Sequence, residues 1–173
     1  MRRRPAVAVA LIAAAAVVLD QLAKVLVRAT MAPPGTSIAL AGDLLRLTYT
    51  RNSGAAFGIL PGGAPLFIGV SVGVLVAVIV YAWRWGPDRV WVIVALGLTA
   101  GGAAGNLVDR ALLGWVTDFI QVPFGFPVFN IADASISVGV GMLVWWLLFG
   151  PTLHGDPVPE SGNIRGGHSE GSA

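Results

Sequence analysis

The sequence predicts an all-α polytopic membrane protein, with four transmembrane helices and a small extracytoplasmic β-sheet region. Of its 173 residues, 55% are hydrophobic and only 12% are charged, and the mean hydropathy is +0.77. A soluble domain of this size carries about twice that charged fraction. The apolar residues also come in long blocks rather than in stripes, which indicates helices that face lipid.

Four apolar blocks reach the length that a helix needs to cross a bilayer, about twenty residues at 1.5 Å per residue. In hydrocarbon each block must be helical, because an unpaired backbone N–H or C=O group finds no water there. We expect helices over four ranges: residues 5–28, 64–81, 90–108 and 131–149. Glycines at four-residue spacing indicate close helix packing. They are Gly69 and Gly73, then Gly97, Gly101 and Gly105.

The N-terminal segment has the pattern of a secretory signal peptide, because three arginines at positions 2–4 precede an apolar run. No small-x-small cleavage site follows that run, and apolar residues continue through Val25, Leu26 and Val27. We therefore expect a helix that is retained.

Four crossings place both termini on one side of the membrane. By the positive-inside rule, the arginines at 2–4 and those in the short loop 83–89 predict that this side is the cytoplasm. The segments 29–63 and 109–130 then lie on the extracytoplasmic side. The localisation expected from these features is the cell membrane, with several passes.

The first extracytoplasmic segment contains the pattern of a β-hairpin. Leu45, Leu47 and Tyr49 alternate with polar residues, and period two predicts a half-buried strand. The sequence Ala-Gly-Asp at 41–43 provides a turn from a partner strand around Ile38 and Leu40.

Residues 1–150 are expected to form a single membrane-embedded domain. The following residues, 151–173, consist of Gly, Pro, Ser, His and Glu with almost no large apolar side chain. Such a segment cannot bury enough surface to fold alone, so a disordered cytoplasmic tail is predicted.

Composition excludes several kinds of site. The chain has no cysteine, which excludes a disulfide scaffold, thiolate metal sites and a cysteine nucleophile. Its two histidines, His154 and His168, both lie in the polar tail, so neither a histidine triad nor a three-histidine zinc site is expected. The net charge of +2 gives no reason to expect a nucleic-acid partner.

Ionisable residues are expensive in membrane segments and therefore indicate function. Those of this chain gather at the extracytoplasmic ends of the predicted helices. Asp118 falls in the loop between the third and fourth helices, and Asp133 in the first turn of the fourth. Because the third helix ends and the fourth begins on the same face, these two carboxylates can meet. The rest of the cluster consists of Asp20, Lys24, Asn106, Asp109 and Arg110.

Asp118 and Asp133 have the chemistry of a peptidase dyad. The apolar and aromatic residues around Asp118 favour its neutral acid, while the helix N-terminus near Asp133 favours its carboxylate. Two close carboxyl groups in unlike settings share one proton, so that one acts as base on a water and the other as acid. Which of them holds the proton stays open, since a coupled pair titrates as a unit.

Structural roles explain some of these residues equally well. Asn130 and Asp133 fit the N-cap and first turn of a helix, and capping accounts for them as well as catalysis does. Asp118, taken alone, also fits a solvated loop residue.

The remaining charges of the cluster have structural explanations too. Asp20 and Lys24 are four residues apart, which favours an ion pair within one helix. Asp109 lies at a helix C-terminus, where a carboxylate is unfavourable, so Arg110 or a partner from another helix must offset it.

The chain resembles a known family, lipoprotein signal peptidase, also called signal peptidase II. Five stretches match in the family's order and together cover about residues 20–149. They are Asp20-Gln21-x-x-Lys24, Asn52-Ser53-Gly54-Ala55-Ala56-Phe57-Gly58, Gly105-Asn106-Leu107-Val108-Asp109-Arg110, Gly114-x-Val116-x-Asp118-Phe119 and Phe129-Asn130-Ile131-Ala132-Asp133.

The resemblance implies a membrane aspartic endopeptidase without a metal or organic cofactor. Such enzymes remove signal peptides from prolipoproteins by cutting before a diacylglyceryl-modified cysteine, and globomycin inhibits them. The implied partners are therefore the lipidated precursor and membrane lipids, and we expect a monomer. The implied catalytic residues are Asp118 and Asp133, the substrate-binding residues Asn52, Asn106, Arg110 and Asn130, and the structural support Asp20, Lys24, Asp109, Gly54 and Phe57.

The segment with Asn52 and Phe57 is expected to cover the site and exclude bulk water. Two other classes of protein fit the sequence less well. A small transporter needs polar groups at several depths, whereas the second, third and fourth helices are nearly free of them over their inner halves. A purely structural membrane protein would leave the five matching stretches unexplained.

Overall fold

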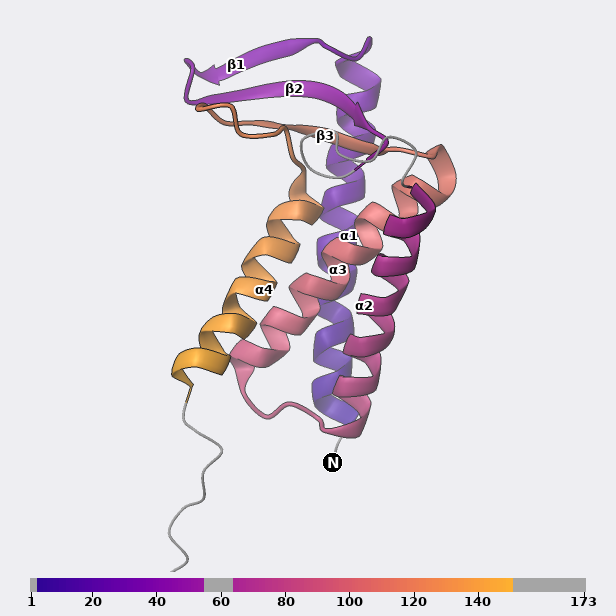
Figure 1. Cartoon of the computed structure of the whole chain (residues 1–173), viewed down its shortest axis with the longest axis vertical. Helices are drawn as coiled ribbons and strands as arrows, with labels where there is room; N and C mark the ends of the chain where they lie inside the picture. The colour runs from indigo at the N-terminus through magenta and orange to yellow at the C-terminus, as the bar shows by residue number, and fades with distance from the viewer. Residues whose placement is uncertain (1–2, 55–63, 151–173) are drawn as a thin grey trace, which may run out of the picture.

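The computed structural model describes residues 3–54 and 64–150, and four long helices dominate it (Figure 1). Each is long and apolar enough to cross a membrane, which confirms the predicted architecture. The third helix continues beyond its predicted end at residue 108. Phe57 and the predicted tail 151–173 lie outside the described residues. The helices are α1 (Arg3–Thr30), α2 (Ala64–Arg84), α3 (Val90–Leu113) and α4 (Ile131–Phe149).

Helix α3 is the central helix of the bundle. It packs against the other three, with α4 and α2 on either side of it and α1 behind (Figure 1). Of its most apolar stretch, 61% is buried, against 17% or less for each of the other three helices. The outer helices therefore present most of their apolar surface to lipid, as the composition indicated.

Glycines allow α3 to approach its neighbours closely. A Cβ atom at Gly101 would lie 2.6 Å from the Cβ of Ala16 on α1, and one at Gly102 would lie 2.7 Å from Cγ1 of Ile136 on α4. Both distances are far shorter than real contacts, so only glycine fits. The predicted packing role is wrong for Gly69 and Gly73, because a Cβ at either would meet no described atom within 4 Å.

A three-stranded antiparallel sheet lies at the end of the bundle where α1 finishes and α4 begins (Figure 1). The predicted hairpin is confirmed as β1 (Ser37–Ala41) and β2 (Leu45–Asn52). A third strand, β3 (Val116–Gln121), pairs with β2. The placement of Asp118 in a loop was wrong, because this residue lies within β3 and only 2% of it is exposed.

The pairing of β2 with β3 contains a bulge. Leu47 is opposite Ile120, but the next recorded pair is Thr50 opposite Asp118, so β2 has one residue more than β3 between the two pairs. Beyond the bulge the register continues to the end of β2. The sheet is fixed to α1 by an apolar cluster of Val27, Met31, Tyr49 and Phe119.

We predict that Gly102→Ala destabilises the protein by about 1–3 kcal/mol, the usual cost of forcing an extra methyl group into a packed site. The added methyl would overlap the Ala132 carbonyl oxygen, which belongs to the backbone of α4 and cannot move alone. Gly73→Ala is the matched control and should be neutral or slightly stabilising, because alanine favours the helix and the space is open. Thermal unfolding in detergent measures both, and equal midpoints for the two variants would contradict the tight crossing.

Candidate active site

Asp118 and Asp133 line one cavity of about 490 Å³ beneath the sheet. Strand β3 carries the first and the opening turn of α4 the second, so two elements separate in the sequence bring them together. Asn52, Gly54 and Arg110 line the same cavity. We call Asp118 and Asp133 the dyad, and this space the dyad cavity.

Two asparagine amides hold the Asp118 carboxylate. Its Oδ1 accepts a hydrogen bond from Nδ2 of Asn130 at 2.6 Å, and its Oδ2 accepts one from Nδ2 of Asn52 at 2.9 Å. The backbone N–H of Gly54 donates to Oδ1 of Asn52 at 3.0 Å, which fixes the orientation of that amide. The carboxylate is therefore held at both oxygens by neutral donors.

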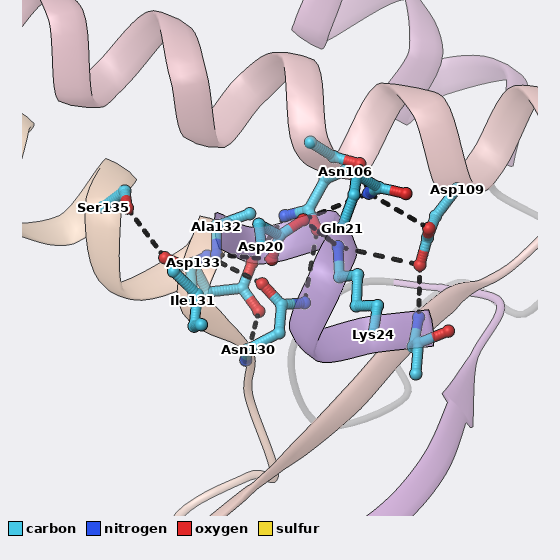
Figure 2. Close-up of polar contacts among 12 residues, drawn as sticks. Asp20, Gln21, Lys24, Asn106, Asp109, Asn130, Ile131, Ala132, Asp133 and Ser135 are labelled. Atoms are coloured by element: carbon cyan, nitrogen blue, oxygen red, sulfur yellow. Dashed lines mark hydrogen bonds and ion pairs between the residues drawn. The ribbon is translucent and has the colours of Figure 1, made fainter. Parts of the chain in front are cut away.

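Asp133 is held at both oxygens as well. Its Oδ1 accepts from Nδ2 of Asn106 at 2.7 Å and its Oδ2 from the backbone N–H of Asn130 at 3.2 Å (Figure 2). The backbone N–H of Asp133 donates in turn to Oδ1 of Asn130 at 2.9 Å, so the pair forms a capping box. Helix capping, which the sequence indicated, is confirmed. It does not compete with a place in the site, because the same carboxylate also lines the dyad cavity.

The orientation of the Asn106 amide follows from its neighbours. Its Oδ1 accepts from Nζ of Lys24 at 2.9 Å and from Nδ2 of Asn130 at 3.2 Å. An ammonium group only donates, so the amide oxygen must face Lys24. Nδ2 is then left to donate to Asp133.

A buried ion pair joins α1 to this arrangement. Lys24 and Asp20 are both fully buried, and Nζ lies 2.8 Å from Oδ2, which confirms the predicted pair within one helix. Oδ1 of Asp20 accepts the backbone N–H of Ala132 at 2.9 Å (Figure 2). Asp20 thus fixes the first turn of α4 directly beside Asp133.

The close partners of the Asp109 charge at the C-terminal end of α3 come from α1 and β3. Its Oδ2 accepts the backbone N–H of Thr117 at 2.8 Å and lies 3.6 Å from Nζ of Lys24. Its Oδ1 lies 3.5 Å from Nη1 of Arg28. We call Asp20, Lys24, Arg28 and Asp109 the support cluster.

Arg110 lies in the wall of the dyad cavity. Its guanidinium group lies 5.1 Å from the centre of the Phe67 ring. Among the described residues no carboxylate lies within ion-pair distance of it, although it lines the dyad cavity. A positive charge is therefore available to a bound molecule.

Two neutral polar residues of the site carry no role in the sequence analysis, and neither does the charged residue Arg28. Gln21 donates through Nε2 to the Gly105 carbonyl oxygen at 3.0 Å and to Oδ1 of Asp109 at 3.3 Å. Thr117 accepts a hydrogen bond from Arg28 at 2.8 Å. Gln21 and Thr117 are neutral, so the charge pattern of the sequence does not indicate them. Gln21 follows Asp20 directly in the first matching stretch, and this position is the one feature of the sequence that points to it.

The pKa of Asp118 is raised to about 6. Burial is the main cause, because it penalises the charged form, and the negative charge of Asp133 adds to it. The hydrogen bonds from Asn52 and Asn130 and the charge of Lys24 act in the opposite direction. A carboxyl group with this pKa can give and take a proton near neutral pH.

Comparison with known proteins identifies the family. Residues 12–149 match the family model described as signal peptidase (SPase) II. A lipoprotein signal peptidase of Moorella thermoacetica is 44% identical over 140 residues, which are 80% of this chain and 91% of that protein. One of Geobacillus kaustophilus is 43% identical over 155 residues, which are 88% and 96% of the two chains.

Solved structures agree with the sequence matches. Two structures described as bacterial membrane enzymes determined by the in meso method superpose with TM-scores of 0.75 and 0.73. They are 37% and 36% identical to this chain, of which they cover 80% and 82%, and the match takes in 85% and 92% of their own lengths. The four helices and the sheet therefore belong to a known enzyme fold. The chain is a member of the signal peptidase II family, the membrane aspartic peptidases that remove signal peptides from prolipoproteins.

Proposed function

We propose that this chain cuts a prolipoprotein just before a diacylglyceryl-modified cysteine, and that Asp118 and Asp133 activate one water molecule for the attack. The observation that supports this most directly is that both carboxylates line one cavity, each held by donors at both of its oxygens. Preorganised groups of this kind accelerate a reaction because they need not reorganise as charge develops.

The proposed reaction needs one proton on the dyad. The ionised carboxylate removes a proton from water while the water oxygen attacks the scissile carbonyl carbon, and the protonated carboxyl group donates to the departing amide nitrogen. Each carboxylate oxygen accepts one hydrogen bond from the protein and has two lone pairs, so room for water and substrate remains. Arg110, with its charge directed along the cavity wall, is suited to bind a substrate carbonyl group.

The proposed location of the site is the extracytoplasmic face. Arg4, Arg84 and Arg89 lie at the end of the bundle opposite the sheet, which supports a cytoplasmic position for that end and for both termini. Helix α1 has 28 residues and so extends about 42 Å, longer than the roughly 30 Å of bilayer hydrocarbon. Its last turns, beside the dyad, therefore reach headgroup depth, where a lipidated cysteine would be held. We further propose a monomer that globomycin inhibits.

Asp118→Asn and Asp133→Asn should each reduce kcat by at least about 10²–10⁴-fold, because each removes a proton-transferring group. Both asparagines keep the shape of the side chain, so insertion should be kept, but each turns its NH2 group towards a donor that the carboxylate accepted, which should lower stability by about 1–3 kcal/mol. Asp43→Asn is the matched control, since that carboxylate is fully exposed on the hairpin turn. The assay uses purified protein and a diacylglyceryl-modified precursor, with and without globomycin. Normal processing by either dyad variant would end the assignment.

The pH dependence of kcat/KM should show the pKa at which the dyad loses its one remaining proton. Because the pKa of Asp118 is about 6, kcat/KM should fall as the pH rises through that value and the dyad loses its acid. Asn52→Ala removes a donor that stabilises the carboxylate, so it should raise this pKa and move the fall to higher pH. A profile without a fall, or a shift to lower pH in Asn52→Ala, would contradict the role of Asp118.

Asp20→Asn should reduce stability while the folded fraction still turns over. The asparagine can still accept the Ala132 N–H through its amide oxygen, but it leaves Lys24 without its nearest counter-charge. Breaking a buried ion pair in this way costs about 3–5 kcal/mol. The measurements are the thermal midpoint in detergent and kcat per folded molecule, again beside Asp43→Asn. A well-folded Asp20→Asn variant without turnover would place Asp20 in the catalytic machinery instead.

A further inference from the structure

A second hollow lies on the membrane-facing surface, towards the end of α4 that is remote from the dyad. It has a volume of about 640 Å³ and is almost entirely apolar. We call it the α4 groove. Its walls include Trp91 at the start of α3 and Val138, Gly141, Met142, Trp145 and Phe149 of α4.

The α4 groove adjoins the dyad cavity. Val138 lines both, with Ala134 on the cavity side and Gly141 and Trp145 on the groove side. These four residues are spaced by four, three and four positions, so they lie along one face of the helix. This face of α4, which we call the track, therefore leads from the dyad cavity to the α4 groove.

Gly141 forms an open place in this track. A Cβ atom there would meet no described atom within 4 Å. Gly139, two residues earlier, differs completely, because a Cβ there would lie 2.7 Å from the Ala95 carbonyl oxygen of α3. Gly139 thus serves the packing of the bundle, whereas the surface at Gly141 is free to receive another helix at short range.

We propose that the α4 groove seats the apolar helix of the substrate's signal peptide. This inference rests on the proposed function, which places the scissile bond at the dyad. The residues before that bond must then return through the bilayer as a helix, since no other backbone is satisfied there. The partner is a single apolar helix, with a small residue or a gap facing Gly141.

The dimensions of the track fit such a helix. The apolar region of a signal peptide has about 7–15 residues, which as a helix span roughly 10–22 Å. Gly141 and Trp145 follow Asp133 by eight and twelve positions, which corresponds to about 12 and 18 Å along α4. Trp91 and Trp145, 72% and 67% exposed, thus lie beside the first residues of that region.

Kinetics with a filled groove test this proposal. Gly141→Leu should raise KM by about tenfold with kcat nearly unchanged, because it removes binding that is equal in the ground and transition states. Gly73→Leu on α2 is the matched control, since that glycine is also open and membrane-facing, and it should leave both constants unchanged. An unchanged KM in Gly141→Leu would mean that the groove holds only lipid chains, and would overturn the proposal.

Cross-linking provides a test that does not depend on cleavage. The chain has no cysteine, so Gly141→Cys and Gly73→Cys each introduce a single thiol. Each is combined with Asp118→Asn and oxidised with a precursor that carries one thiol in the middle of its apolar region, its lipidated cysteine being blocked as a thioether. A disulfide should form at position 141 and not at position 73. Equal or absent cross-linking at 141 would refute the docking site, while the dyad assignment would stand or fall on its own variants.

Discussion

The arrangement of the site depends on one constraint, which is that a charge buried in the bundle needs an opposite charge or hydrogen-bond partners from the protein. Lys24 is fully buried at a depth where water cannot stabilise an ammonium group. The support cluster balances the charge of Lys24, because it contains two carboxylates and two basic groups and is neutral as a whole. Any one of its three buried members, Asp20, Lys24 and Asp109, would if left alone be an uncompensated charge in a medium of low dielectric constant.

This balance also positions the catalytic groups, because each member of the cluster has a second contact outside it. Asp20 binds the backbone of α4 at Ala132, and Asp109 binds the backbone of β3 at Thr117. Both contacts lie next to a dyad residue in the sequence. Lys24 directs the amide of Asn106 towards Asp133. The charges that hold the helices together therefore also set the distance between β3 and the first turn of α4.

The groups that touch the dyad differ from those in the support cluster. Asn52, Asn106 and Asn130 are neutral, and they hold the carboxylates by hydrogen bonds without adding a full positive charge. A lysine in direct contact with Asp118 would stabilise its ionised form strongly and remove its proton at neutral pH. Lys24 instead donates to Oδ1 of Asn106, and the Asn106 amide donates to Asp133. The three asparagine amides between the support cluster and the dyad thus fix the positions of the two carboxylates and still allow the dyad to bind and release a proton near neutral pH.

Much of this architecture follows from the sequence, because lipid allows so few alternatives. A long apolar block must be a helix, and alternation around Leu47 predicted the hairpin. Strand β3 was missed because its pairing partner lies about seventy residues earlier, and no local pattern reports such a partner. Residues 116–121 are mostly buried on both faces, so they lack the alternation that marks a half-buried strand. In the sequence, the capping role and the site role of Asp133 are alternatives, and only the three-dimensional arrangement shows that one carboxylate has both contacts.

The bulge in β2 has a consequence for how this enzyme can vary. Successive residues of a strand point to opposite faces, so the extra residue between Leu47 and Thr50 decides which side chains of β2 share a face with Asp118. With it, Asn52 reaches the carboxylate; if the pairing of Leu47 with Ile120 continued without a bulge along the same chain, Tyr49 would lie opposite Asp118 and the Asn52 amide would turn to the other face. The bulge is thus as necessary to the site as the amide that it turns towards Asp118. A one-residue insertion between Thr50 and Asn52 would turn that amide away, whereas an insertion in the β1–β2 turn leaves the pairing of β2 with β3 unchanged.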